Sequence, residues 1–139
     1  MSTPGHPAAP APGAPCPCGW GEAFEACCGR HLAGAEAPTA EALMRSRYTA
    51  FALGDVAHLL RTWDPATRPR ELVLDDDVRW RRLVVLGTSG GGPFDDTGTV
   101  EFEAHHRRAG RRGVQAERSL FARRAGRWVY VGPDADRLA

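Results

Sequence analysis

The stretch GTVEFEAHHRRAGRRGVQAERSLFARRAGRWVYVG, residues 98–132, decides the fold. Apolar and polar residues alternate along it with a period of two, which is the pattern of half-buried strands. Including an earlier segment, this pattern predicts four strands, at about 79–88, 98–107, 113–123 and 127–132. Short connections that contain glycine join them, at 89–97, 108–112 and 124–126. Parallel crossovers need a dozen or more residues, so the sequence predicts an antiparallel meander.

Upstream of the sheet, apolar residues recur at helical spacing. Thr39 has the side chain of an N-cap, and Glu41 follows in the first turn, where the helix dipole favours an acid. The predicted helix ends at Gly54. Asp55 caps a second, short helix, which the Asp64-Pro65 pair stops. Two helices followed by a four-stranded meander define the α+β class, with the helices packed on one face of a curved sheet.

The formal net charge of the 139 residues is +1, which argues against a protein that binds polyanions over its whole surface. The charge is unevenly distributed, because residues 105–127 hold eight arginines and one acid. The hairpin RRAGRR at 107–112 is basic enough to contact nucleic-acid phosphates. No aromatic residue is interleaved there to stack on bases, so a solvated arginine-rich turn is the favoured interpretation.

The two ends of the chain look unlike the middle. Residues 1–15 contain five prolines and no large apolar side chain after Met1, which predicts a disordered tail. A second, shorter tail is expected at 134–139. No run approaches the ~20 apolar residues of a membrane span, and the N-terminus lacks the basic start and apolar core of a secretory signal. We therefore expect a cytoplasmic protein without membrane contact, either monomeric or weakly dimeric.

Four cysteines are clustered in CPCGWGEAFEACCG, residues 16–29. Stable disulfides are rare in the reducing cytosol, so clustered thiols there indicate a metal site. A structural zinc would supply folding energy that so short a segment lacks, roughly 10–16 kcal/mol of apparent binding in zinc-finger peptides. The candidate ligands are Cys16, Cys18, Cys27 and Cys28, with His31 as an alternative to Cys28. Without a metal, the cluster would be a set of free or oxidisable thiols.

This segment resembles the SEC-C motif, a short zinc-binding module of the protein-export ATPase SecA and of many other bacterial proteins. The four cysteines match its ligand positions. The fourth position is Cys or His in the family, which favours Cys28 over His31. Trp20 stands where serine is usual, and Glu22 and Glu25 replace residues of a stretch that is often lysine-rich. The partner of SecA is therefore not carried over to this chain.

Beyond the motif, the chain is similar to the bacterial YchJ-like family. The segments that carry the resemblance are LMRSRYTAF at 43–51, TWDP at 62–65, ERSLF at 117–121 and GRWVYV at 126–131. The resemblance implies a central domain like nuclear transport factor two, in which helices cover a cone-shaped antiparallel sheet. It implies metal binding rather than an established reaction. Asp64 and Leu120 depart from the His and Arg expected at their positions.

The expected organisation follows from these segments. It comprises a tail at 1–15, a SEC-C-like zinc knuckle at 16–37, the cone-like α+β domain at 38–133 and a tail at 134–139. The linker at 30–38 has small residues and few apolar ones, so we expect the knuckle and the domain to be weakly coupled in stability.

Arg47 falls inside the apolar arc of the first helix, where a charge must be paired. Glu117 is the lone acid of the basic third strand and alternates with Ser119. We expect an Arg47–Glu117 ion pair beneath the helix. The functional interpretation is a polar cluster in the cone, formed by Arg47, Tyr48, Trp63, Asp64, Glu117 and Ser119. The structural alternative is a buried ion pair that orients the helix on the sheet, and helix termination accounts for Asp64.

The leading hypothesis is a zinc-binding, non-catalytic protein whose knuckle serves as a structural or docking module, with a protein partner at the knuckle. The first alternative is an enzyme or small-molecule binder that uses the cone. A cone filled by side chains would exclude it. The second alternative is association with nucleic acid through the arginine-rich hairpin. No residue is assigned a catalytic role.

Overall fold

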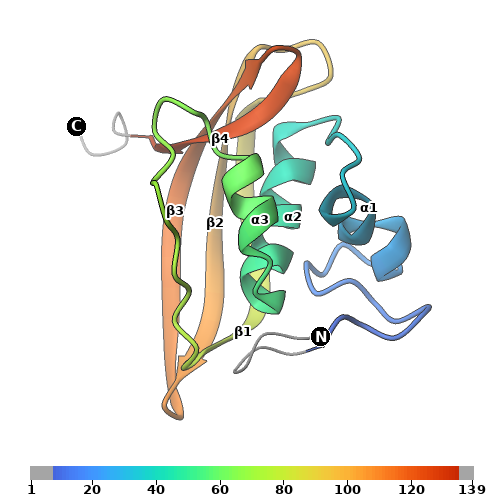
Figure 1. Cartoon of the computed structure of the whole chain (residues 1–139), viewed down its shortest axis with the longest axis vertical. Coiled ribbons are helices and arrows are strands. Elements are labelled where there is room, and N and C mark those ends of the chain that lie inside the picture. The colour runs from blue at the N-terminus through green and yellow to red at the C-terminus, as the bar shows by residue number, and fades with distance from the viewer. Residues whose placement is uncertain (1–7, 135–139) are drawn as a thin grey trace.

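The computed structural model describes residues 8–134 and contains the expected meander (Figure 1). Its strands are β1 Val78–Gly90, β2 Thr97–Arg108, β3 Arg111–Arg124 and β4 Arg127–Pro133. They pair antiparallel in the order β1–β2–β3–β4, which confirms the predicted topology. The register shifts at two points between β1 and β2 and at one point between β3 and β4. Such irregularities bend and twist strands, as a curved sheet requires.

Two of the connections are tight turns built from the same tetrapeptide, Arg-Ala-Gly-Arg, at 108–111 and 124–127. The backbone φ is positive at both central residues of each turn, as two-residue hairpins that match the strand twist require. The values are 51° at Ala109, 79° at Gly110, 53° at Ala125 and 80° at Gly126. The first turn is shorter than the predicted connection at 108–112, so β3 begins earlier than expected.

The helical elements precede the sheet. They are the 3-10 turn η1 Phe24–Ala26 and the helices α1 Cys28–Leu32, α2 Ala40–Leu53 and α3 Val56–Arg61. Both predicted ends of α2 are confirmed, because Thr39 Oγ1 accepts a hydrogen bond from Ala42 N at 3.1 Å and Gly54 has a φ of 78°. Asp55 caps α3 as predicted. No helix within residues 8–134 is long and apolar enough to cross a membrane.

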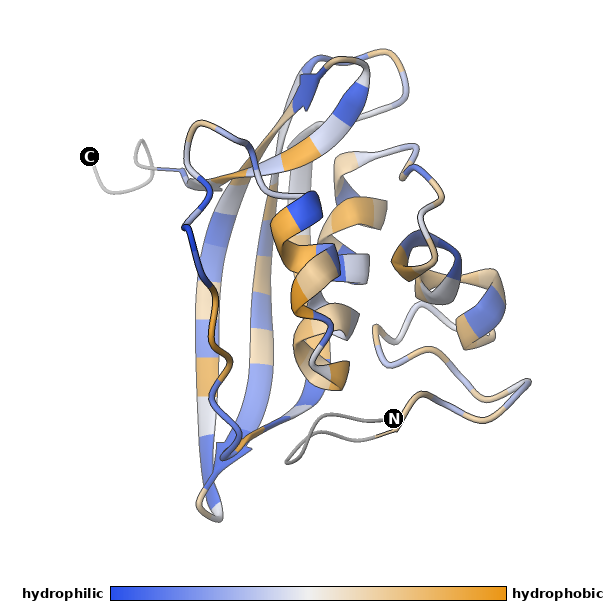
Figure 2. Cartoon of the chain, viewed as in Figure 1, coloured by the Kyte–Doolittle hydropathy of each residue, from blue (hydrophilic) through white to orange (hydrophobic). Residues whose placement is uncertain are grey.

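Helices α2 and α3 lie on one face of the sheet, whereas α1 packs on α2 (Figure 1). Strand alternation decides which sheet residues meet α2. On β2, Val100, Phe102 and Ala104 are buried, whereas Glu101 and Glu103 between them remain half-exposed. Figure 2 shows the same alternation of hydrophobic and hydrophilic residues along the strands. The core therefore lies between this inner face of the sheet and α2, as the predicted fold class requires.

The knuckle packs directly on α2. Its four cysteines share one buried cluster with Leu43, Met44 and Tyr48. Arg45 Nη1 donates a hydrogen bond to Cys18 O at 3.0 Å, and Cys16 Sγ lies 3.8 Å from Thr49 Oγ1. The contacts do not support the expected weak coupling. That expectation came from the composition of the 30–38 linker. The knuckle and the domain are instead joined by direct contacts between α2 and the cysteines.

The predicted tails are only partly described. Residues 1–7 and 135–139 lie outside the described residues. Within the remainder of the predicted 1–15 tail, Gly13 N donates to Glu25 Oε1 at 2.9 Å, and Ala14 O accepts from Phe24 N at 2.9 Å. The disordered tail is therefore a wrong prediction for residues 13–15. The prediction rested on the lack of large apolar side chains in this segment. Its backbone groups are nevertheless ordered by hydrogen bonds to Phe24 and Glu25 of the knuckle.

Candidate metal centre and cone cavity

The structure brings all four predicted metal ligands together. The cysteine sulfurs lie within 4.8 Å of one another, and the sulfurs of Cys18 and Cys27 are 3.6 Å apart. Four sulfurs at ~2.3 Å from a tetrahedral zinc would be separated by ~3.8 Å. All four cysteines are buried. The cluster therefore has the dimensions and the donor set of a four-thiolate metal site.

Local turns hold the two cysteine pairs face to face. Gly19 has a φ of 79°, and its N–H donates to Cys16 O at 3.1 Å. Cys16 N in turn donates to Glu22 O at 2.9 Å, which closes the first half of the knuckle. Gly29 is needed for space, because a Cβ there would lie 2.8 Å from Phe24 O. Gly19 and Gly29 thus have direct structural roles in the knuckle.

The buried thiols shift the pKa values of one another, because their sulfurs lie so close together. Hydrogen bonding to Cys16 raises the pKa of Cys28, and burial raises the pKa of Cys27 to about 12. Hydrogen bonds from Cys18 and Cys28 lower the pKa of Cys16. Four thiolates so close together need a positive charge between them, which a divalent metal supplies. Four sulfur ligands would fill the coordination sphere of a tetrahedral metal and leave no position for water.

His31 does not join the cluster. Within residues 8–134, the group of potential metal ligands at this point contains only the four cysteines. His31 Nδ1 instead lies 2.9 Å from Ala35 O, just beyond the end of α1. The geometry therefore favours Cys28 over His31 as the fourth ligand.

A cavity of about 190 Å³ lies between the sheet and α2. A single water needs about 10–15 Å³ of such space, so the cavity has room for a small organic molecule. Its apolar and aromatic lining consists of Met44, Tyr48, Phe51, Trp63, Trp80, Phe102, Ala104, Phe121 and Tyr130. Its other lining residues are Arg47, Gln115, Glu117 and Ser119. Five of the six predicted pocket residues line this cavity, and Asp64 does not.

Arg47 is buried as predicted, but it does not form the expected ion pair with Glu117. Its Nη1 donates to Leu59 O at 2.8 Å and to Thr62 Oγ1 at 2.7 Å. Burial lowers the pKa of Arg47 to about 10. The predicted pairing was wrong because the helical phase gave the depth of Arg47 correctly but could not show that the end of α3 would supply acceptors.

Tyr130 stands between the two charged groups. The guanidinium carbon of Arg47 lies 4.6 Å from the centre of its ring, and its hydroxyl donates to Glu117 Oε2 at 2.8 Å. Ser119 Oγ donates to the same carboxylate oxygen at 2.5 Å. Burial first, and then the Glu117 carboxylate, raise the pKa of Tyr130, so its phenol remains a neutral donor. The cationic side chain of Arg47 and the anionic side chain of Glu117 therefore both contact Tyr130, which lies between them.

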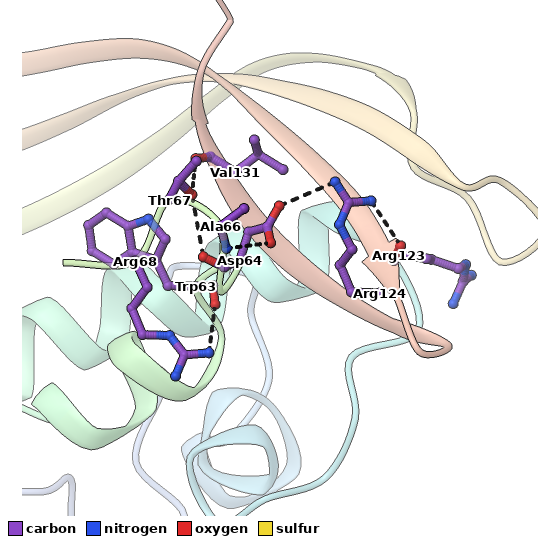
Figure 3. Close-up of polar contacts among 8 residues, drawn as sticks. All are labelled: Trp63, Asp64, Ala66, Thr67, Arg68, Arg123, Arg124 and Val131. Carbon is purple, nitrogen blue, oxygen red and sulfur yellow. Dashed lines mark hydrogen bonds and ion pairs between the residues drawn. The ribbon is translucent and has the colours of Figure 1, made fainter. Parts of the chain in front are cut away.

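Asp64 serves the turn after α3 (Figure 3). Its carboxylate accepts from Ala66 N at 3.1 Å and pairs with Arg124 at 3.2 Å. Its backbone N–H donates to Tyr130 O at 2.8 Å, which joins the end of α3 to β4. The placement of Asp64 in the pocket is therefore corrected to the structural role that was its alternative.

Sequence reasoning missed several cavity residues. Gln115 could have been found, because strand alternation places it on the same side as Glu117 and Ser119. Tyr130 pairs with Phe121 across the turn at 124–127, so the register of that hairpin could have placed it on the same face. Its parallel bridge with Trp63 joins segments far apart in the chain, which no pattern within one segment predicts.

The arginine-rich hairpin belongs to a larger basic surface. Register places Arg107 opposite Arg79, so arginines of β1 lie beside those of the hairpin. The exposed arginines of this surface are Arg79, Arg81, Arg82, Arg107, Arg108, Arg111 and Arg112. Part of its charge is neutralised, because Asp75 pairs with Arg108 at 2.8 Å. Nucleic-acid association through this surface stays a secondary hypothesis.

Fold and site together define a class of protein: a cone-shaped domain like nuclear transport factor two, with a four-cysteine motif of the SEC-C type packed on its main helix. The family model of the YchJ middle NTF2-like domain matches residues 39–133. The chain therefore belongs to the YchJ family.

Relatives agree with this assignment. A UPF0225 protein of Corynebacterium efficiens is 60% identical over 116 residues, which cover 83% of this chain and 88% of the relative. A UPF0225 protein of Chromobacterium violaceum is 50% identical over 123 residues, which cover 85% of this chain and 90% of that one.

Two solved structures have the same fold. The solution structure of a SEC-C motif containing protein from Rhodopseudomonas palustris matches with a TM-score of 0.75 and 37% identity, over 87% of this chain and 98% of that chain. A crystal structure of a SEC-C motif containing protein from Psychrobacter arcticus matches with a TM-score of 0.66 and 24% identity, over 86% and 80% of the two chains.

Proposed function

We propose that the chain is a zinc-binding, non-catalytic protein whose metal is structural. The supporting observation is the set of four buried cysteine sulfurs within 4.8 Å of one another. Tetrahedral sets of thiolates suit zinc, which has no geometric preference of its own and tolerates four soft ligands. A closed set of this kind holds protein segments together without offering a reaction site.

The contacts of the knuckle support a structural role over a docking role. Arg45 of α2 binds Cys18 O, and its guanidinium carbon lies 4.5 Å from the centre of the Trp20 ring. Trp20 is the large exposed apolar residue of the knuckle, and α2 already occupies one side of its ring. The metal would therefore fix the knuckle as a layer on α2.

Zinc content of the purified full chain tests this proposal. We expect one zinc per chain by elemental analysis, retained after dialysis. Cys27→Ser should lose zinc, whereas His31→Ala, the matched control, should retain the wild-type amount. A metal-free protein with two disulfides would overturn the proposal, and halved zinc retention in His31→Ala would show that the fourth ligand was assigned wrongly.

We propose, second, that the cone binds a small molecule. The observation that favours it is the cavity itself, whose volume of about 190 Å³ is not filled by side chains. An apolar pocket with a few converging polar groups is the usual form of a small-molecule site. This proposal does not depend on the identity of the metal.

Filling the cavity tests the second proposal. A fragment library titrated into the ¹⁵N-labelled protein should shift the amide signals of cavity residues. Ala104→Leu adds bulk to the buried lining and should abolish those shifts. Ala116→Leu, on the exposed side of the neighbouring strand, is the matched control and should keep them. If no fragment shifts the cavity signals, the cone is not a binding site.

A further inference from the structure

The buried guanidinium of Arg47 has hydrogen-bonding capacity to spare. Arg47 is only 5% exposed and carries five N–H donors. Leu59 O and Thr62 Oγ1 account for Nη1 alone. No acceptor among residues 8–134 engages Nε or Nη2. Nε and Nη2 form one edge of the guanidinium. Because Arg47 lines the cavity, this edge matches the two oxygens of a carboxylate.

Glu117 has spare capacity of the opposite kind. Ser119 and Tyr130 both donate to its Oε2. Its Oε1 receives no hydrogen bond from the described part of the chain. Glu117 also lines the cavity, so this oxygen matches a cationic donor such as an ammonium group. The cavity therefore offers one site for an anion and one for a cation.

The charges of the lining decide what kind of ligand fits both sites. Among the lining residues, Arg47 has a cationic side chain and Glu117 an anionic one, so their charges cancel. A simple carboxylate would leave a net negative charge in an aromatic cavity, and a simple amine would leave a net positive one. Uncompensated charge away from water is unfavourable. A ligand that carries one positive and one negative charge leaves the occupied cavity with no net charge.

The remaining wall determines the body of that ligand. Tyr48, Phe51 and Trp80 belong to one aromatic cluster, with ring centres 6.2 Å apart from Tyr48 to Trp80 and from Phe51 to Trp80. All three line the cavity. Aromatic faces and edges of this kind favour an apolar or aromatic group over a polar one.

We propose that the cone cavity binds a small zwitterion of the α-amino-acid type, with its carboxylate on Arg47, its ammonium on Glu117 and an apolar or aromatic side chain against the aromatic wall. The proposal rests on the proposed small-molecule function of the cone and names the chemical class of its ligand.

Three compounds with one hydrocarbon skeleton test the charge requirement. They are L-phenylalanine, 3-phenylpropanoate, which lacks the ammonium, and 2-phenylethylamine, which lacks the carboxylate. Calorimetric titration of the zinc-loaded full chain should give L-phenylalanine an affinity at least tenfold higher than either other compound. Equal or tighter binding of a singly charged compound would overturn the proposal.

Glu117→Gln should invert the preference. The amide oxygen can still accept from Ser119 and Tyr130, but the cavity gains a net positive charge. We expect this variant to bind 3-phenylpropanoate at least tenfold more tightly than L-phenylalanine. Glu103→Gln makes the same change on β2 beside His105, outside the cavity lining, and should keep the wild-type order. An unchanged order in Glu117→Gln would overturn the role of Glu117.

A second variant covers the case in which Glu117→Gln does not fold. Gln115 lines the cavity yet is exposed, so Gln115→Glu should be tolerated. It adds a negative charge and should shift the preference toward 2-phenylethylamine by at least tenfold. If none of the three compounds binds the wild type while other fragments shift the cavity signals, the zwitterion inference alone fails. If no fragment binds, the small-molecule function fails with it.

Discussion

The metal centre and the cone cavity lie on different sides of α2, and they are completed in different ways. Arg45 and Thr49 face the cysteines, whereas Arg47 and Tyr48 line the cavity. The cysteine sulfurs converge on one another, so a single ion completes that site. In the cavity, Arg47 and Glu117 line an open volume of about 190 Å³, and we propose that a small molecule completes that site. On these proposals, the metal centre stabilises the fold, whereas the cavity binds a ligand within it.

Removing the metal should have the largest effect and should show whether the two regions are independent. Because the cysteines share a buried cluster with α2, metal loss should also loosen the cavity wall. We expect Cys18→Ser to remove a large part of the roughly 5–15 kcal/mol of unfolding free energy typical of a domain. Urea denaturation measures this, with His31→Ala as control. An unchanged midpoint in Cys18→Ser would show that the knuckle is a separate unit.

Replacing Arg47 should have the next largest effect and should sharpen the account of the cavity. Arg47→Met removes the donor of the hydrogen bonds to Leu59 O and Thr62 Oγ1 and should cost about 3 kcal/mol of unfolding free energy. Glu117→Gln keeps an acceptor for Ser119 and should cost less than ~1 kcal/mol.

The double variant Arg47→Met/Glu117→Gln measures the interaction energy between the two side chains. Because Arg47 and Glu117 are not in direct contact, we expect the effects of the two substitutions to add to within ~1 kcal/mol in chemical denaturation. An interaction energy above ~2 kcal/mol would indicate a direct ion pair in solution and would contradict the arrangement around Tyr130.

A pH titration should have an intermediate effect, through the polar layer that connects the two regions. His58 lies between Ser46 Oγ and Arg61 Nη2, each at 2.9 Å, and Arg61 also donates to carbonyls at the end of α1. Burial, and then the neighbouring Arg61, lower the pKa of His58 to about 4. The folded state therefore resists protonation more than the unfolded state, whose His58 titrates near its usual pKa of ~6.5.

The sign follows from this difference in proton binding. The contribution of neutral His58 to the unfolding free energy is fully present above pH ~6.5 and is lost as the pH falls toward 4. The loss is about 2 kcal/mol between pH 7.5 and pH 5. Urea midpoints of wild type and His58→Gln at both pH values measure it, because shared contributions cancel in the difference. Equal pH slopes for the two proteins would contradict the buried neutral histidine.

The arginine-rich hairpin should matter least to stability. Arg111 and Arg112 are exposed and lie away from both sites. Replacing both with serine should change the unfolding free energy by less than ~0.5 kcal/mol. A loss above 1 kcal/mol would show that this end of the sheet supports the core.

Local signals account for what the sequence predicted well. The four cysteines lie within thirteen consecutive positions, so their spacing brings Cys16 and Cys28 into one cluster once the glycine turns form. The caps Thr39 and Asp55 act on backbone groups three residues away. The strands follow from alternation, and turn glycines mark their ends. Each of these features is decided within about a dozen residues.

Long-range packing accounts for what the sequence could not predict. Arg47 was correctly placed inside, but its acceptors come from α3 and its ring contact from β4. Asp64 was placed in the cavity by its neighbours in sequence, whereas it pairs with Arg124, sixty positions further along. The cover of α2 over the cysteines also depends on tertiary contact. No periodicity within one segment carries this information.

The neighbour-to-neighbour order of the strands bears on the timing of assembly. Each strand pairs with the next one in the chain, and two-residue turns close two of the three hairpins. Hairpins of this kind form within about 1–10 μs, and small sequence separation favours rapid folding. Contacts that span the chain, such as Trp128 Nε1 to Pro38 O across 90 positions, close far larger loops. We expect the metal to meet a sheet that has already formed, and so to set the lifetime of the finished protein rather than the speed of its folding.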